Sequence, residues 1–316
     1  MDKYNIIFFG TPQFALPTLK ALHQEGFNIV LVVTRPDKPS GRRLLLKPSP
    51  VKSLAQELNL PICDSLKELR SKINNLKPQF GVVVAYGKII PQDILDSFPF
   101  GLINVHPSLL PKYRGPSPIQ AALLNGDQDT GITIMKLDEE MDHGDILSQK
   151  EVPISPIDNS ETLHDKLADL GAKLLVQVLP EFLTGKIIPQ PQDHAQATLC
   201  KIIRKDDGLI DWSKSAEEID RQIRAFSPWP GSFSDFMIKN KKTRLKILKA
   251  RLAENSWLAE GSTSTVKEPV KNQIGKFQQK NGHLYVQCGQ GSLIIEELQP
   301  EGKKTMSAQE FINGYF

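Results

Sequence analysis

The sequence predicts two domains: an α/β domain with a Rossmann-like, doubly wound parallel sheet, and a C-terminal OB-like β-barrel. Apolar strands alternate with helical segments up to about residue 185, which is the pattern of a parallel sheet covered by helices. The segment "FGVVVAYG" is continuously apolar, as expected of a strand that is buried on both faces. From "DGLIDW" onward, short alternating strands separated by glycine turns are typical of a small barrel.

The elements of the first domain are expected in alternating order. Gly26 and Gly126 each follow an amphipathic run and so indicate the end of a helix. Strands are expected in "YNIIFFG", "NIVLVVT", "FGVVVAYG", "GLINVH" and "TGITIMKL", and helices in "PTLKALHQEG", "VKSLAQEL", "SPIQAALLNG" and residues 160–184. Residues 35–50 are rich in proline and basic side chains, so we expect a long irregular loop there.

The domain boundaries follow from a change in composition. We expect residues 1–185 to form the α/β domain, 186–206 a polar linker and 207–316 the barrel domain. Residues 236–280 hold eleven Lys or Arg against three Glu. Such a basic stripe on a small β domain indicates a polyanionic partner such as nucleic acid, although the same residues could form an ordinary solvated face.

Composition argues against several classes of protein. Hydrophobic residues make up 40% of the chain and charged residues 24%, which is ordinary for a globular protein. Three widely spaced cysteines without a CxxC pair favour reduced thiols over a disulfide framework or a zinc site. No run approaches the roughly 18 apolar residues of a membrane span, and the first residues lack the pattern of a secretory signal. We therefore expect a cytoplasmic protein without a membrane partner.

The end of the strand "GLINVH" carries two polar side chains. Asn104 and His106 are two residues apart, so they point to the same face of the strand. Pro107 favours an extended backbone at His106, and active sites of α/β sheets lie at the carboxyl ends of strands. An amide beside an imidazole could stabilise an oxyanion and move a proton. The alternative is a hydrogen-bonded core histidine beside a turn-forming asparagine.

A group of acidic residues follows the strand "TGITIMKL". The stretch "LDEEMDHGDIL" contains several carboxylates, and its spacing matches no EF-hand, HExxH or Cys/His pattern, so we expect no metal. A carboxylate from this stretch could instead face His106 and orient it. The first strand-to-helix turn, "FFGTPQF", lacks GxGxxG, and no GxxxxGK[ST] is present, which argues against a dinucleotide or P-loop site.

Several segments together resemble methionyl-tRNA formyltransferases, a family that uses 10-formyltetrahydrofolate. The resemblance runs nearly end to end, through "FFGTPQFALPTLKAL", "TRPDKPSGR", "SPVK", "AYGKIIP", "INVHPSLLPKYRGPSPIQAALLNGD", "TGITIMKLDEEMDHGDIL", "KIIRKDDGLIDW" and "RAFSPWPGSF". The Asn-x-His…Asp set is shared by formyltransferases with other acceptors, so it is stronger for the reaction than for the acceptor. The loop at 35–50 and the C-terminal segments resemble the tRNA enzyme in particular.

The resemblance implies a reaction and a role for each part of the chain. A formyl group would pass from the folate to the α-amine of methionyl-initiator tRNA, with Asn104, His106 and Asp142 as catalytic residues. Residues 1–185 would be the catalytic domain and 207–316 a tRNA-binding barrel, in a monomer. The folate would be bordered by Ser108, Leu109, Leu110, Pro111, Tyr86 and Gly87, and the tRNA by Arg42, Arg43, Lys47, Lys241, Lys242, Arg244 and Lys246.

Some alternatives remain open on the sequence. Leu44–Leu46 in the basic loop could form a wedge against a helix end of the tRNA, or could pack on the first domain. The acceptor could be a small amine, such as glycinamide ribonucleotide or an amino-sugar nucleotide. The chain could also be a non-catalytic RNA-binding protein. Neither small acceptor accounts for the basic barrel, and binding alone does not account for the Asn-x-His…Asp set.

Overall fold

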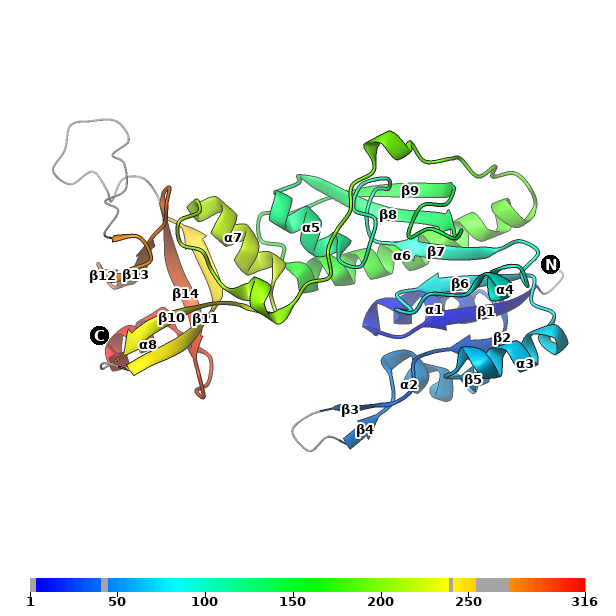
Figure 1. The fold of residues 1–316 in the computed structure, drawn as a ribbon, viewed down its shortest axis with the longest axis horizontal. Coiled ribbons are helices and arrows are strands. Elements are labelled where there is room, and N and C mark those ends of the chain that lie inside the picture. The colour runs from blue at the N-terminus through cyan, green and yellow to red at the C-terminus, as the bar shows by residue number, and fades with distance from the viewer. Residues whose placement is uncertain (1–3, 41–44, 239–240, 254–272, 316) are drawn as a thin grey trace. The chain divides into compact units, whose positions relative to one another are not determined.

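The computed structural model describes residues 4–40, 45–238, 241–253 and 273–315 (Figure 1). Contacts divide the chain into two compact units. The first consists of Met1–Pro118, Asp129–Pro153 and Leu163–Lys201, and the second of Ile119–Gln128, Ile154–Thr162 and Ile202–Phe316. Within the described ranges, no helix is long and apolar enough to cross a membrane.

The first unit is built on a seven-stranded sheet, as far as the chain is described, in the order β5-β2-β1-β6-β7-β8-β9. Its strands are β1 (Asn5–Gly10), β2 (Asn28–Val33), β5 (Ile62–Cys63), β6 (Phe80–Val84), β7 (Leu102–His106), β8 (Asp129–Lys136) and β9 (Ile146–Pro153). Neighbours from β5 to β7 are parallel, whereas β8 and β9 pair antiparallel at one edge. The predicted Rossmann-like sheet is confirmed, with two antiparallel strands added to its parallel core.

Helices cover both faces of this sheet. They are α1 (Leu16–Gln24), α2 (Pro50–Glu57), α3 (Leu66–Leu76), α4 (Gln92–Leu95) and most of α6 (Ser160–Leu183), with short 3-10 turns η1 (Gln13–Ala15) and η2 (His194–Gln196). α6 lies so close to β7 that a methyl group at Gly171 would be 2.6 Å from Val105 Cγ1. On the other face, side chains of α3 and α4 join a core cluster with Val83 and Leu102. This second face is the one that carries Asn104, because Asn104 pairs in register with Val83.

The segment 35–50 differs from the predicted irregular loop. It contains two short strands, β3 (Lys38–Ser40) and β4 (Leu45–Lys47), which pair antiparallel. The prolines and basic residues suggested a loop, but the two arms can satisfy each other's backbone hydrogen bonds as a small hairpin. Leu46 is exposed, so it does not pack on the first unit as one alternative required. Leu44 and the Leu45 side chain lie outside the described residues.

The strand order reverses between β1 and β6, which is where ligands bind in open α/β sheets. A hydrogen bond joins the loops after these two strands, because Thr11 Oγ1 donates to the Tyr86 carbonyl at 3.1 Å. The carboxyl end of β7 lies one strand further along the same edge. His106 therefore ends its strand beside the expected crevice.

The second unit contains an antiparallel sheet that curls into a half-barrel (Figure 1). Its strands, in the part of the chain that is described, are β10 (Ser232–Ile238), β11 (Lys241–Leu252), β12 (Phe277–Lys280), β13 (His283–Gln287), β14 (Ser292–Pro300) and β15 (Met306–Ser307). The helical elements of this unit are α5 (Pro118–Asn125), η3 (Lys205–Gly208), α7 (Ala216–Ala225) and α8 (Ala308–Tyr315), of which α7 and α8 contribute to the core of the sheet. The predicted OB-like fold class is confirmed, although α7 and α8 were not expected.

Candidate active site

Strand β7 presents Asn104 and His106 on one face, as their spacing predicts. Both side chains are buried. His106 pairs in register with Thr133 on β8, so Thr133 belongs to the same face. Val105, between the two polar residues, faces α6. The strand therefore packs Val105 against a helix and places its two polar side chains on the opposite face, near its carboxyl end.

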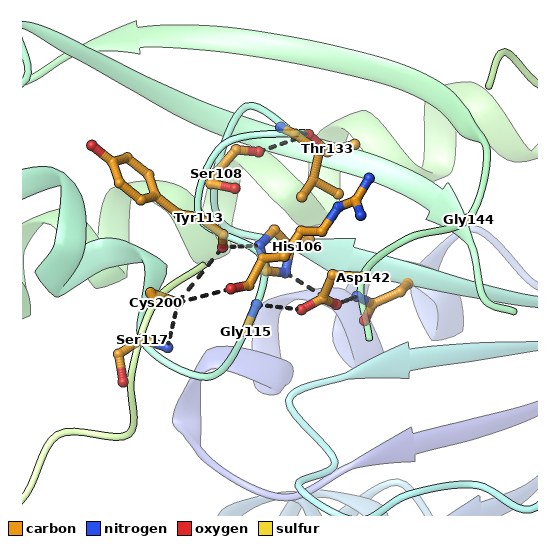
Figure 2. Close-up of polar contacts among 12 residues, drawn as sticks. His106, Ser108, Tyr113, Gly115, Ser117, Thr133, Asp142, Gly144 and Cys200 are labelled. Atoms are coloured by element: carbon orange, nitrogen blue, oxygen red, sulfur yellow. Dashed lines mark hydrogen bonds and ion pairs between the residues drawn. The ribbon is translucent and has the colours of Figure 1, made fainter. Parts of the chain in front are cut away.

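Asp142 lies beside this polar pair, although it is 36 residues from His106 in the sequence. Its Oδ1 is 3.4 Å from His106 Nδ1 and 3.4 Å from Asn104 Nδ2. Its Oδ2 accepts a hydrogen bond of 2.8 Å from the Gly115 backbone N–H (Figure 2). The three residues predicted to be catalytic are thus brought together around one carboxylate.

The environment of Asp142 favours its charged form. Burial is the largest single effect and acts to raise the pKa of the carboxyl group, whereas the neighbouring His106 and the Gly115 N–H lower the pKa. The Arg114 charge also lowers the pKa, and the net result lies below the ordinary value. Asp142 is therefore a carboxylate at neutral pH and can accept, but not donate, hydrogen bonds.

The ring of His106 is held at both nitrogens. Nε2 is 3.1 Å from the Tyr113 carbonyl oxygen, which can only accept, so Nε2 carries the proton in this contact (Figure 2). Nδ1 then faces Asp142. Each ring nitrogen of His106 therefore faces an oxygen atom that can accept a hydrogen bond.

The segment Ser108–Pro111, predicted to border the folate, has a backbone that is fixed by hydrogen bonds. Ser108 Oγ donates to the Lys112 carbonyl at 2.6 Å. Thr133 Oγ1 donates to the Ser108 carbonyl at 2.7 Å (Figure 2). The same oxygen accepts from the Leu110 N–H at 3.0 Å. Gln149 Nε2 donates to the Leu110 carbonyl at 2.8 Å. Ser108 and Leu110 are buried, whereas Leu109 and Pro111 are partly exposed.

Tyr86 and Gly87, also predicted to border the folate, are placed differently from each other. The Tyr86 ring lies in the core, 2% exposed, and packs edge-to-face on Phe9 with a centroid distance of 5.7 Å. Gly87 is exposed and has a φ of 72°, which favours glycine. The backbone of this turn can therefore face a ligand, but the Tyr86 ring faces the core.

The residues predicted to contact tRNA are only partly described. Lys47 is exposed at the end of β4. On β11, Lys242 forms an ion pair of 2.9 Å with Asp235, and Arg244 Cζ lies 4.2 Å from the centroid of the Phe233 ring. Lys246 has no ion-pair partner among the described residues. Arg42, Arg43 and the side chain of Lys241 lie outside the described residues.

Sequence reasoning missed several residues that support this site. Thr133 and Gln149 hold the Ser108–Pro111 backbone, and Arg114 and Gln192 contact each other beside Asp142. Their partners are far away in the sequence, so no local spacing could have indicated them. In the ranges that are described, no cluster of His, Cys, Asp or Glu could hold a metal ion.

Comparison with known families defines the class of this protein. A family model described as formyl transferase matches residues 4–179, and one described as formyl transferase, C-terminal domain, matches residues 202–315. The two matched regions contain the α/β sheet and the half-barrel sheet, respectively. The chain is therefore a formyl transferase.

Two curated relatives identify the family within this class. The methionyl-tRNA formyltransferase of Geobacter sulfurreducens is 40% identical, over 100% of this chain and 95% of the relative. That of Thermodesulfovibrio yellowstonii is 44% identical, over 98% of this chain and 95% of the relative. This chain belongs to the methionyl-tRNA formyltransferase family.

A solved structure shares the fold over nearly the whole chain. It is that of WlaRD, a sugar 3N-formyl transferase, determined in the presence of dTDP and 5-N-formyl-THF. The TM-score is 0.66 at 21% identity, and the match covers 96% of this chain and 100% of that chain.

Proposed function

We propose that this protein transfers the formyl group of 10-formyltetrahydrofolate to the α-amine of methionyl-initiator tRNA. The family and the relatives named above support this reaction. The observation that carries it in the structure is the meeting of Asn104, His106 and Asp142 at the end of β7. A small-amine acceptor is not favoured, because the relatives that align over nearly the whole chain are methionyl-tRNA formyltransferases.

In the proposed reaction, the amine nitrogen attacks the formyl carbon and a tetrahedral oxyanion forms. The new C–N bond is made and the bond to N10 breaks, while the amine loses one proton and N10 gains one. Asn104 would donate a hydrogen bond to the oxyanion. Its Nδ2 makes only a long contact of 3.4 Å with Asp142 in the described structure, so the amide keeps donor capacity for this role.

Asp142 and His106 would handle the charge and the proton. Because its pKa is lowered, Asp142 is a carboxylate that can keep a charged His106 in place. The same carboxylate would take the proton that the amine loses, through water. The charged imidazole would stabilise the oxyanion and supply a proton toward N10. The Tyr113 carbonyl fixes the ring orientation through Nε2. No step of this proposal uses a metal ion.

We place the pterin of the folate against Ser108–Pro111 and the backbone of Gly87. A pterin edge carries hydrogen-bond donors and acceptors, and a rigid backbone can present matching groups at low entropic cost. The hydrogen bonds from Thr133 and Gln149 give the segment that rigidity. The structure of WlaRD, determined with 5-N-formyl-THF present, supports a folate partner for this fold.

We place the tRNA backbone on the basic residues of the second unit, with Lys47 and the 35–50 hairpin as a further contact. Basic side chains hold phosphates without reading the sequence, so Lys242, Arg244 and Lys246 would position the tRNA rather than select it. Because Lys242 is already paired with Asp235, Lys246 is the better candidate for a phosphate contact.

The assignment of catalysis to residues 1–185 and tRNA binding to 207–316, with 186–206 as a linker, stays a prediction. A monomeric state in the cytoplasm also stays a prediction.

One assay tests the proposed function against its alternatives. The protein is mixed with 10-formyltetrahydrofolate labelled in the formyl group, together with methionyl-initiator tRNA, glycinamide ribonucleotide or an amino-sugar nucleotide. We expect label on the methionyl-tRNA alone. Label on a small amine would replace the proposed acceptor, and no label on any acceptor, with tRNA still bound, would favour an RNA-binding protein.

A further inference from the structure

The chain that follows α6 runs along the Asp142 loop rather than away from it. Gln190 and Ile146 exchange both backbone hydrogen bonds, each at 2.8 Å. Two residues later, the Gln192 side chain is buried, at 5% exposure, although glutamine is mostly a surface residue. A segment expected to be a linker thus brings a buried amide to the site.

All the hydrogen-bonding capacity of the Gln192 side chain is used. Its Nε2 donates to the Asp142 carbonyl at 2.9 Å and to the Gly144 carbonyl at 2.8 Å. Its Oε1 accepts from Arg114 Nε at 3.0 Å and from Arg114 Nη2 at 2.7 Å. Two donors and two lone pairs are satisfied at once, which a chance surface contact would not achieve.

Arg114 supplies the other half of this contact. Its side chain is buried, and among the described residues no carboxylate lies within ion-pair distance of its guanidinium. A buried cation of this kind depends on neutral acceptors, which here are Gln192 Oε1 and His194 Nδ1, the latter at 2.8 Å. The next residue, Gly115, donates its N–H to the Asp142 carboxylate. Arg114 therefore links Gln192, which holds the Asp142 main chain, to Gly115, which holds the Asp142 side chain.

The conformation of Asp142 explains why such support is needed. Its φ of 52° lies in the left-handed region, which few residues other than glycine adopt. Such backbone conformations persist when the surroundings fix them, and they are concentrated at functional sites. Gln192 fixes the carbonyls at 142 and 144. Gly115 fixes the carboxylate (Figure 2).

We propose that Gln192, anchored by Arg114, is a positioning residue that sets the Asp142 carboxylate against His106 for formyl transfer. This inference rests on the proposed function. Gln192 touches neither His106 nor Asn104 in the described contacts, so it acts through Asp142. The general consequence is that residues after α6 are part of the catalytic unit.

The test substitution is Gln192→Glu, which keeps the shape and the acceptor for Arg114. The carboxylate cannot donate to the two carbonyls, so Asp142 loses its main-chain support. Misplacing a reacting group by about 1 Å can cost on the order of 10²-fold, so we expect kcat to fall about 10- to 100-fold with KM for tRNA unchanged. Gln190→Glu is the matched control, because Gln190 is exposed and, among the described residues, its side-chain amide donates only to the Ile188 carbonyl. If Gln192→Glu does not fold, Gln192→Asn withdraws the same amide without introducing a charge.

A double-mutant cycle separates positioning from a general loss of structure. If Gln192 acts through Asp142, Gln192→Glu should cost nothing further in an Asp142→Asn background. A fall that is equally large in both backgrounds, or an unchanged kcat in Gln192→Glu, would overturn the proposal.

A spectroscopic measurement keeps this inference separate from the proposed function. Arg114–Gly115 is the single Arg-Gly pair in the sequence, so labelling with ¹³C-arginine and ¹⁵N-glycine gives one amide signal for Gly115. That signal should move in Gln192→Glu and stay in place in Gln190→Glu, and an unmoved signal in Gln192→Glu would overturn the contact. If the wild-type protein formylated no methionyl-tRNA, the proposed function would fail, while the Gly115 signal would still decide whether Gln192 positions Asp142.

Discussion

Replacing Thr133 by valine should loosen the segment that we place against the folate. The Thr133 hydroxyl is fully buried and joins three groups: the Ser108 carbonyl, the Leu110 N–H and the Gln149 side-chain amide. Valine keeps the shape and leaves the first two without this partner. Each buried unsatisfied group costs roughly 1–3 kcal/mol, so the free energy of unfolding should fall by about 2–6 kcal/mol.

The same change should weaken folate binding selectively. A loosened Ser108–Pro111 segment must be ordered when the ligand binds, at a cost of roughly 1–3 kcal/mol, which corresponds to about a 5- to 150-fold rise in KM for 10-formyltetrahydrofolate. KM for methionyl-tRNA should not change. Urea unfolding and steady-state kinetics with the donor varied measure both effects. Thr130→Val is the control, because Thr130 is buried on the same strand and its hydroxyl has no partner in the described structure. Lower stability with an unchanged KM for the donor would refute the placement of the folate.

Two further predictions concern charge. Asp142→Asn should flatten the acid dependence of stability. The Asp142 pKa is lowered in the folded protein, because His106, the Gly115 N–H and Arg114 together outweigh burial. The charged carboxylate therefore stabilises the fold above the unfolded-state pKa, and this stabilisation is lost as pH falls from about 5 through the folded-state pKa. Urea unfolding of the wild type and of Asp142→Asn at several pH values checks this prediction. The other titratable groups that face the carboxylate are His106, Arg114 and the Cys200 thiol. Equal acid sensitivity of the wild type and Asp142→Asn would contradict the prediction. Lys246→Ala should reduce the log–log salt slope of tRNA binding by about 0.9, the value for one duplex phosphate, whereas Lys72→Ala on α3 should not. An unchanged slope for Lys246→Ala would remove Lys246 from the interface.

Much of the fold could be predicted because it depends on local patterns. The apolar run of β6, the glycine after α1 and the length of α6 each reflect burial or helix termination within one segment. The hairpin of β3 and β4 could not, since it depends on pairing between two short arms in a proline-rich stretch. α7 was also missed, although its capping box of Ser215 and Glu218 is a recognisable start signal.

Some residues of the candidate site could likewise be predicted from the sequence, and others could not. Asn104 and His106 could be predicted from period-two spacing at a strand end, and Asp142 from the resemblance. Gln192 could not, because its partner Arg114 is 78 residues away and a single glutamine in a polar stretch carries no signal. The Tyr86 ring was expected near the ligand because it follows a strand, but packing on Phe9 turned it into the core.

The central claim is that the Asn104, His106 and Asp142 cluster performs the formyl transfer. The single-turnover rate of formylation of methionyl-initiator tRNA tests it most directly, measured in His106→Ala and wild type with both substrates saturating, so that differences in binding do not contribute. Because positioned acid–base groups typically contribute about 10²- to 10⁴-fold, we predict a fall of that size in His106→Ala, with the tRNA still bound. A rate in His106→Ala close to that of the wild type would contradict the account.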